Sequence, residues 1–274
     1  MGSKQPRQVD THVHVVSDDE ARYPLQPGDV TGPWYRDHPC SIEALLRQMD
    51  DAEVDAALLV QAVSAYQFDN RYTLDSARRF PQRCSAVVCT DLSSEDPGAD
   101  VRRDAAAGAR GVRWWGIGGA ALGTPRSVWD AAAALGLPVV VTIMTDQLEE
   151  LAATIPTLPS VPIALDHCGF VDWAGGVPAA LSALKEYSNV HCKVSTIVLD
   201  QMAQHGDPRD GVAALADSFG ADRLMWGSDF SQTHDRPYGD LAEYARHAAS
   251  KLGDDDRHAL LAGTACRVWP ELAR

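Results

Sequence analysis

Two histidines, His12 and His14, lie one residue apart at the end of a short run rich in β-branched residues. Side chains of a β-strand alternate between its two faces, so this spacing directs both imidazoles to the same side, together with Asp10. Two imidazoles that converge from one strand end can bind a first-row divalent metal, and zinc, manganese, iron and cobalt all accept such ligands. The chain has nine histidines, so the pair needs partners elsewhere in the sequence.

The elements that must position those partners alternate between apolar, strand-like runs and helical patterns. The eight strands are expected at 9–15, 54–63, 84–91, 111–115, 138–144, 161–167, 190–195 and 223–229. Such runs carry little polar alternation, as parallel strands covered on both faces do. The alternation predicts an α/β fold, namely a single (β/α)8 TIM barrel that spans 1–274 as one domain, with an extended loop after the first strand and an extra C-terminal helix. The alternative, a doubly wound open sheet, would bring a glycine-rich phosphate turn after its first strand, and that turn is absent from the sequence.

Composition narrows the class of partner. The formal net charge is −14 and the isoelectric point is near 4.9, which argues against nucleic acid and anionic membrane surfaces as partners. The six cysteines show no CxxC spacing, so we expect reduced thiols. No apolar run approaches the roughly 18 residues of a membrane span, and the N-terminus lacks the apolar core of a signal peptide. We therefore expect a cytoplasmic protein that acts on a small molecule, and a homo-oligomer stays open.

The carboxyl ends of barrel strands meet at one face, where catalytic groups lie in this fold. Charged residues seldom end buried strands unless they have partners there. The polar residues at or near these ends are His12 and His14 on strand one, Arg113 on strand four, His167 on strand six, His191 and Lys193 on strand seven, and Asp229 on strand eight. We expect them to form a site together.

Each of these residues also has a structural alternative. Asp229 could cap the turn that follows it, and His167 could bond a loop carbonyl. Arg113 could pair with a carboxylate inside the barrel instead of binding substrate. His234, in the loop after strand eight, is a candidate substrate contact or a solvated loop residue.

The chain resembles the amidohydrolase superfamily, in the amidohydrolase-related branch that includes fuconolactonase-like and 2-pyrone-4,6-dicarboxylate lactonase-like enzymes. The matching segments follow the family's order along almost the whole chain, at 10–14, 59–61, 111–113, 164–167, 190–195, 223–229 and 263–267. The resemblance implies a centre lined by His12, His14, His167 and Asp229, with these four as the metal ligands. It adds Gln61, on strand two, to the substrate contacts.

The sequence departs from the superfamily pattern at two strands. Strand five carries Thr142 where many members have a histidine, and strand four carries Arg113 where binuclear members place a bridging lysine or glutamate. The resemblance implies that the lactonase-like branch lacks the same ligand and includes enzymes with one metal or none. We therefore expect one divalent ion (zinc, manganese or iron) rather than two, and metal-free activity stays open.

The expected activity is hydrolysis of a lactone or related cyclic ester. Asp229 would act as general base, the metal would polarise the carbonyl, and without a metal the imidazoles would donate hydrogen bonds to the oxyanion. Arg113 would bind a substrate carboxylate, with Lys193, His191 and His234 as further contacts.

Three other functions stay open. Relatives of the branch include non-oxidative decarboxylases, and histidine and carboxylate ligands also suit a non-haem iron oxygenase or hydroxylase. A binding module that has lost activity would be expected to have a scrambled set of strand-end residues, which this chain does not have.

Overall fold

The computed structural model describes residues 7–27, 32–117 and 121–274, and its centre is one parallel sheet of eight strands in sequential order. Each strand pairs in parallel with the next, and a bridge between Val13 and Phe230 joins the last strand region to the first. The strands are β1 Val9–Val13, β2 Ala56–Val60, β3 Cys84–Cys89, β4 Gly111–Trp115, β5 Val139–Thr142, β6 Ile163–Leu165, β7 Val190–Ser195 and β8 Leu224–Gly227. This arrangement confirms the predicted (β/α)8 barrel.

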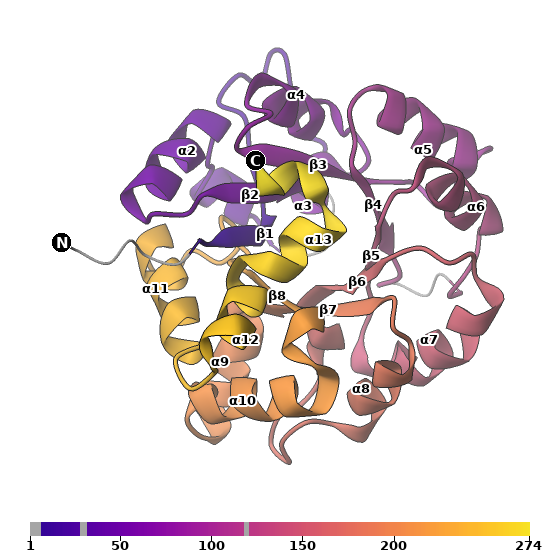
Figure 1. Cartoon of the computed structure of the whole chain (residues 1–274). Helices are drawn as coiled ribbons and strands as arrows, with labels where there is room; N and C mark the ends of the chain where they lie inside the picture. The colour runs from indigo at the N-terminus through magenta and orange to yellow at the C-terminus, as the bar shows by residue number, and fades with distance from the viewer. Residues whose placement is uncertain (1–6, 28–31, 118–120) are drawn as a thin grey trace.

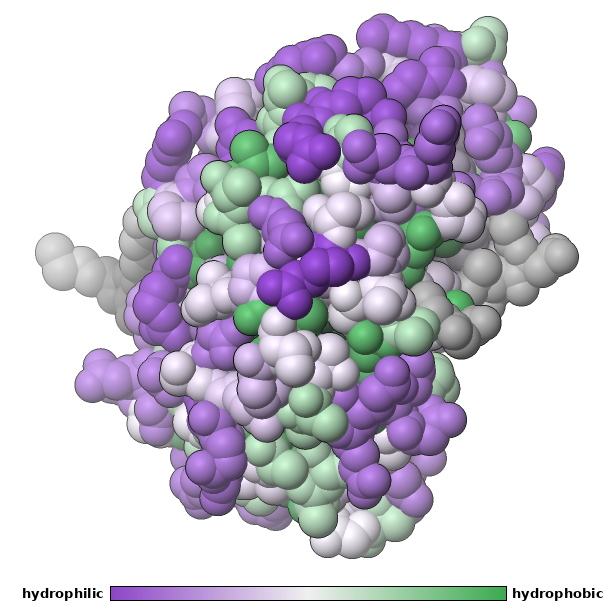
Figure 2. Space-filling model, turned by 90° about the vertical axis from the view of Figure 1, so that its right-hand side faces the viewer, coloured by the Kyte–Doolittle hydropathy of each residue, from purple (hydrophilic) through white to green (hydrophobic). Residues whose placement is uncertain are grey.

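Helices surround the barrel, and the C-terminal helices lie across one of its ends (Figure 1). The helices are α1 Trp34–Asp37, α2 Ile42–Asp51, α3 Val63–Tyr66, α4 Arg71–Arg79, α5 Pro97–Ala106, α6 Arg126–Leu135, α7 Leu148–Thr154, α8 Ala179–Ala183, α9 Thr196–His205, α10 Pro208–Phe219, α11 Tyr238–Ala248, α12 Asp254–His258 and α13 Thr264–Val268. The side that carries α5, α6 and α7 shows hydrophilic residues with smaller hydrophobic areas between them (Figure 2), because these helices turn their apolar faces toward the sheet. Among the described residues, no helix is long and apolar enough to cross a membrane.

Two apolar clusters divide the core. The larger lies between the sheet and the helices. The smaller fills the barrel interior toward the amino ends of the strands. The smaller cluster includes Leu58, Val140 and Met225 from the strands, and Trp269 from the C-terminal segment that closes this end. The polar residues of the interior therefore lie above an apolar floor, toward the carboxyl ends of the strands.

Three segments differ in detail from the predicted elements. Helix α9 was not predicted, because its first turn, Thr196 to Val198, is rich in β-branched residues, which lower helix propensity. Strand β6 ends at Leu165, two residues earlier than expected, and the chain then enters an irregular turn, Asp166–Phe170. The extended loop after β1 contains the short helix α1, and its residues 28–31 lie outside the described part of the chain.

Candidate active site

His12 and His14 both direct their Nε2 atoms toward Asp229, and their Nδ1 atoms are held by other groups. His12 Nδ1 lies 3.0 Å from Asp166 Oδ1, and His14 Nδ1 lies 2.8 Å from the carbonyl oxygen of Val60. A carbonyl oxygen and an ionised carboxylate only accept hydrogen bonds, so both Nδ1 atoms carry the proton. The Nε2 atoms of His12 and His14 are therefore lone-pair donors, which is the form that a metal binds.

Asp229 joins the two histidines from the end of β8. Its Oδ1 atom lies 3.5 Å from both Nε2 atoms, while Oδ2 accepts a hydrogen bond from Thr233 at 3.2 Å. The residue is buried and adopts a left-handed backbone conformation, with φ at +60°. This uncommon conformation for a non-glycine residue turns the carboxylate toward the histidines, and such strain concentrates at functional sites.

His167 joins the cluster from the turn after β6. Its φ is +52°, its ring centroid lies 4.7 Å from that of His12, and its Nδ1 lies 2.8 Å from the hydroxyl oxygen of Ser195. Strand alternation explains the partner, because Ser195 is the last inward-facing residue of β7. The structure thus brings together His12, His14, His167 and Asp229, as the sequence predicted. We call these four residues the open layer.

The atoms of the open layer fit a divalent cation. His12 Nε2 and Asp229 Oδ1 are buried and have no hydrogen-bond partner among the described residues. Together with a ring nitrogen of His14 they form a group whose ligand atoms all lie within 4.8 Å of one another. A tetrahedral ion with bonds of about 2.1 Å would separate its ligand atoms by about 3.4 Å, close to the observed 3.5 Å. His167 belongs instead to a second group of this kind, with His12 and Asp166.

A second set of buried polar residues, which we call the paired layer, supports the first. It consists of Asp166, Lys193, Arg113 and Thr142. Lys193 Nζ lies 3.0 Å from Asp166 Oδ1, and the Arg113 guanidinium lies 2.9 Å from Oδ2. Thr142 donates a hydrogen bond of 2.7 Å to the same Oδ2 and accepts one from Arg113 Nε at 2.8 Å. Both oxygens of this buried carboxylate are therefore occupied by cations and donors.

Burial and these charges set the protonation states. Burial lowers the pKa of His12 well below its usual value, with the Lys193 ammonium acting in the same direction and Asp166 against it. Burial also lowers the pKa of His167. Burial opposes the ionisation of Asp229, but His14 and the neighbouring imidazoles outweigh it and bring its pKa to about 2. The imidazoles of His12 and His167 are therefore neutral at neutral pH, and the carboxylate of Asp229 beside them is anionic.

The backbone of β8 approaches β1 closely at this point. A Cβ atom on Gly227 would come within 2.7 Å of the Cβ of His12. The amide of Asp229 also donates to the carbonyl oxygen of His12 at 2.7 Å. The carboxylate of Asp10 accepts hydrogen bonds from the amides of His12 and Ser228, at 3.0 and 2.9 Å, so it anchors backbone and does not reach the cluster.

Three predicted substrate contacts lie elsewhere or are already bonded. The Gln61 amide donates to the carbonyl oxygens of Gln67 and Asp69 at 3.0 Å, so it holds a loop. His191 lies two residues before Lys193, about 7 Å nearer the floor of the barrel, where its Nδ1 lies 3.3 Å from the carbonyl oxygen of Ile163. His234 is exposed, and its Nδ1 donates to the carbonyl oxygen of Gln232 at 2.6 Å.

Two other predicted contacts are in the site but already have partners. Arg113 and Lys193 both pair with Asp166, which matches the structural alternative considered for Arg113. Sequence reasoning missed Asp166 and Ser195 as site residues. The position of Asp166 directly before His167 at a strand end was the available signal, whereas Ser195 offered none beyond its place at the end of β7.

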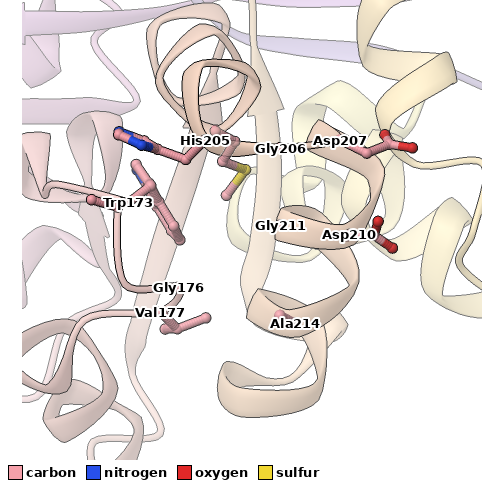
Figure 3. Close-up of a pocket in the computed structure, with 11 residues that line it drawn as sticks. Trp173, Gly176, Val177, His205, Gly206, Asp207, Asp210, Gly211 and Ala214 are labelled. Atoms are coloured by element: carbon pink, nitrogen blue, oxygen red, sulfur yellow. The ribbon is translucent and has the colours of Figure 1, made fainter.

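Aromatic side chains border the open layer. The Trp34 ring centroid lies 5.6 Å from that of His14, and the Phe170 centroid lies 4.7 Å from that of His167. Trp115 lies under the guanidinium of Arg113, with 4.6 Å from Cζ to its ring centroid. A separate cavity of about 380 Å³ lies between the loop after β6 and the α9–α10 junction, lined by residues such as Trp173 and His205 (Figure 3). It includes none of the open-layer residues.

Comparison with known proteins identifies the family and the fold. The family model described as amidohydrolase matches residues 9–270. The L-fucono-1,5-lactonase of Burkholderia ambifaria is 29% identical, covering 95% of this chain and 94% of that protein.

Solved structures share the barrel. A putative 2-pyrone-4,6-dicarboxylic acid hydrolase from Pseudomonas putida has a TM-score of 0.78 and 23% identity, covering 98% of this chain and 99% of that one. An amidohydrolase from Burkholderia multivorans with bound zinc has a TM-score of 0.75 and 24% identity, covering 96% and 99%. The 5-carboxyvanillate decarboxylase of Sphingomonas paucimobilis has a TM-score of 0.71 and 15% identity, covering 97% and 99%. These structures support the fold, and they include more than one chemistry.

Proposed function

Because this chain belongs to the amidohydrolase family, we propose that it hydrolyses a lactone or a related cyclic ester, using one divalent ion held by His12, His14 and Asp229. The lactone-opening activity named for the Burkholderia ambifaria relative supports this reaction. The observation that carries the proposal is that Asp229 Oδ1 lies 3.5 Å from the Nε2 atoms of both His12 and His14, while His12 Nε2 and Asp229 Oδ1 have no hydrogen-bond partner among the described residues. A divalent cation among these atoms would give the two unpartnered ones the partner that buried polar groups normally have.

The side chains suggest distinct roles in the reaction. A divalent ion, when bound, polarises the lactone carbonyl and lowers the pKa of water. Asp229 takes the proton of the attacking water, and its low pKa keeps it ionised for that role. His167 lies beside the ion ligands without joining their group, so it is placed to hydrogen-bond the carbonyl oxygen as negative charge develops there. The ring of Trp34 and that of Phe170 provide apolar walls for a cyclic substrate.

The paired layer bears on the number of ions. A second ion at His12 and His167 would need Asp166 as its third ligand. Both oxygens of Asp166 are already within about 3 Å of Lys193 or Arg113, and these cations repel a further positive charge. We therefore propose a single ion.

The same pairing revises the substrate. Because Arg113 and Lys193 are both buried against Asp166, neither presents a free cation to a substrate carboxylate. A lactone without a carboxylate group fits the described residues better than a carboxylated one. This replaces the carboxylate contact that the sequence predicted for Arg113.

Ring opening of a panel of neutral and carboxylated lactones, followed as proton release after reconstitution with zinc or manganese, tests the proposal. We expect turnover of neutral lactones by the wild type. Release of carbon dioxide from aromatic acids without lactone opening would support a decarboxylase instead. Bound iron together with oxygen consumption would support an oxygenase or hydroxylase.

A further inference from the structure

Two loop segments meet beside the open layer. The first is α1, Trp34–Asp37, which carries the buried Trp34 ring against His14. The second is the turn after β8, residues 231–237. There Thr233 Oγ1 and Gln232 Nε2 lie 3.2 and 3.5 Å from Asp229 Oδ2. Each segment therefore touches one of the proposed ion ligands from the outside.

A pair of stacked imidazoles connects these segments. His38 directly follows α1, and its amide donates to the carbonyl oxygen of Trp34 at 2.8 Å. Its ring lies on that of His234 with the centroids 4.0 Å apart and the planes at 21°. His234 is in turn held by its 2.6 Å contact with the carbonyl oxygen of Gln232. A line of contacts thus runs from Trp34 through both imidazoles to the turn that supports Asp229.

Both rings are exposed, so neither is part of the hydrophobic core. Loss of an exposed ring leaves neither a buried cavity nor an unpaired buried polar group, the usual causes of a large loss of stability. Any large effect of removing the pair would therefore have to act locally, on the two segments that the pair joins.

We propose that His38 and His234 form an aromatic clasp that holds α1 over the open layer and thereby positions substrate. This inference rests on the proposed function, because it assigns the two histidines as positioning residues for the same reaction. The clasp keeps Trp34 against His14 while the turn after β8 keeps Asp229 oriented.

The test uses the full chain with His38→Ala, His234→Ala and the double alanine variant. A double variant, His38→Phe with His234→Phe, restores two flat rings without imidazole chemistry. The matched control is His247→Ala, which removes an exposed histidine from α11. The readouts are amide hydrogen exchange across 32–38 and 231–237, and the separate values of kcat and KM for a lactone substrate.

A stacked aromatic pair predicts exchange that is about 2- to 12-fold faster in either alanine variant, a KM raised by a similar factor, and kcat changed by less than about twofold. The double alanine variant should resemble each single one, because both remove the same contact. The phenylalanine pair should restore wild-type exchange and KM, and the His247 control should change neither.

Unchanged exchange in the single variants would overturn the clasp. Additive effects in the double alanine variant, or failure of the phenylalanine pair to restore exchange, would overturn it as well. The exchange measurement does not need turnover, so it decides the clasp by itself. A wild-type protein that opens no lactone would instead refute the proposed function.

Discussion

The two polar layers inside this barrel are equally buried and differ in how far their atoms are paired. In the paired layer, each oxygen of Asp166 faces a cation and a second donor. In the open layer, His12 Nε2 and Asp229 Oδ1 have no hydrogen-bond partner within the part of the chain that the structure describes. Buried polar groups are normally hydrogen-bonded, so a complete set indicates a structural frame and an incomplete one indicates a place where a ligand binds. The comparison predicts that substitutions in the open layer change chemistry, whereas those in the paired layer change stability.

The largest effect is expected from Asp229→Asn. This change removes the proposed base and an ion ligand, so kcat/KM for lactone opening should fall about 10³-fold or more. Urea unfolding of the metal-free protein should show a smaller loss of stability than Asp166→Asn, because Asp229 faces imidazoles and not buried cations. A large loss of stability with little loss of activity would reverse the roles of the two layers.

The next largest effect is expected from a substitution in the paired layer, and it concerns stability. Asp166→Asn leaves Lys193 and Arg113 buried without their counter-charge, which should lower the free energy of unfolding by about 3–5 kcal/mol. Chemical denaturation measures this value, with the exposed Asp240→Asn in α11 as the control for loss of one charge. A change below about 1 kcal/mol would show that the paired layer is not the frame.

A smaller effect should follow from Ser195→Ala. The substitution removes the hydroxyl beside His167 Nδ1 and leaves the ring less firmly oriented. Loss of such a supporting hydrogen bond should lower kcat/KM by about 10- to 100-fold, while zinc affinity, which rests on the other three open-layer residues, changes little. Steady-state kinetics and zinc titration together check this. A loss of zinc binding equal to the loss of activity would place His167 among the ion ligands.

The smallest effect is expected from His191→Gln. This residue shares the inward face of β7 with Lys193 but lies below both layers, against the carbonyl oxygen of Ile163. Activity on lactones should stay within about twofold of the wild type. A loss above about tenfold would mean that the floor of the barrel contributes to the chemistry.

The barrel and the positions of the open-layer residues could be predicted from the sequence, for physical reasons. Parallel strands buried on both faces give apolar runs that alternation with helices reveals, and polar residues at strand ends, such as His12 and Asp229, stand out against those runs. The paired layer was not predictable in the same way. Whether Arg113 meets a substrate or Asp166 depends on strand register and depth inside the barrel, which a single sequence does not contain.

His191 and Lys193 both face the barrel interior, but they lie at different distances from the carboxyl ends of the strands. Only the structure shows these positions. Gln61 ends a strand as a catalytic residue would, yet its amide is taken up by a loop whose conformation has no local signature.

The most direct test of the account is the stoichiometry of zinc bound to the metal-free protein, measured by titration calorimetry with elemental analysis. The wild type should bind one ion per chain, and Asp229→Asn should bind at least about 100-fold more weakly because it lacks a charged ligand. Two ions per chain, or equal affinity in the two proteins, would contradict the assignment of the open layer as a single metal site.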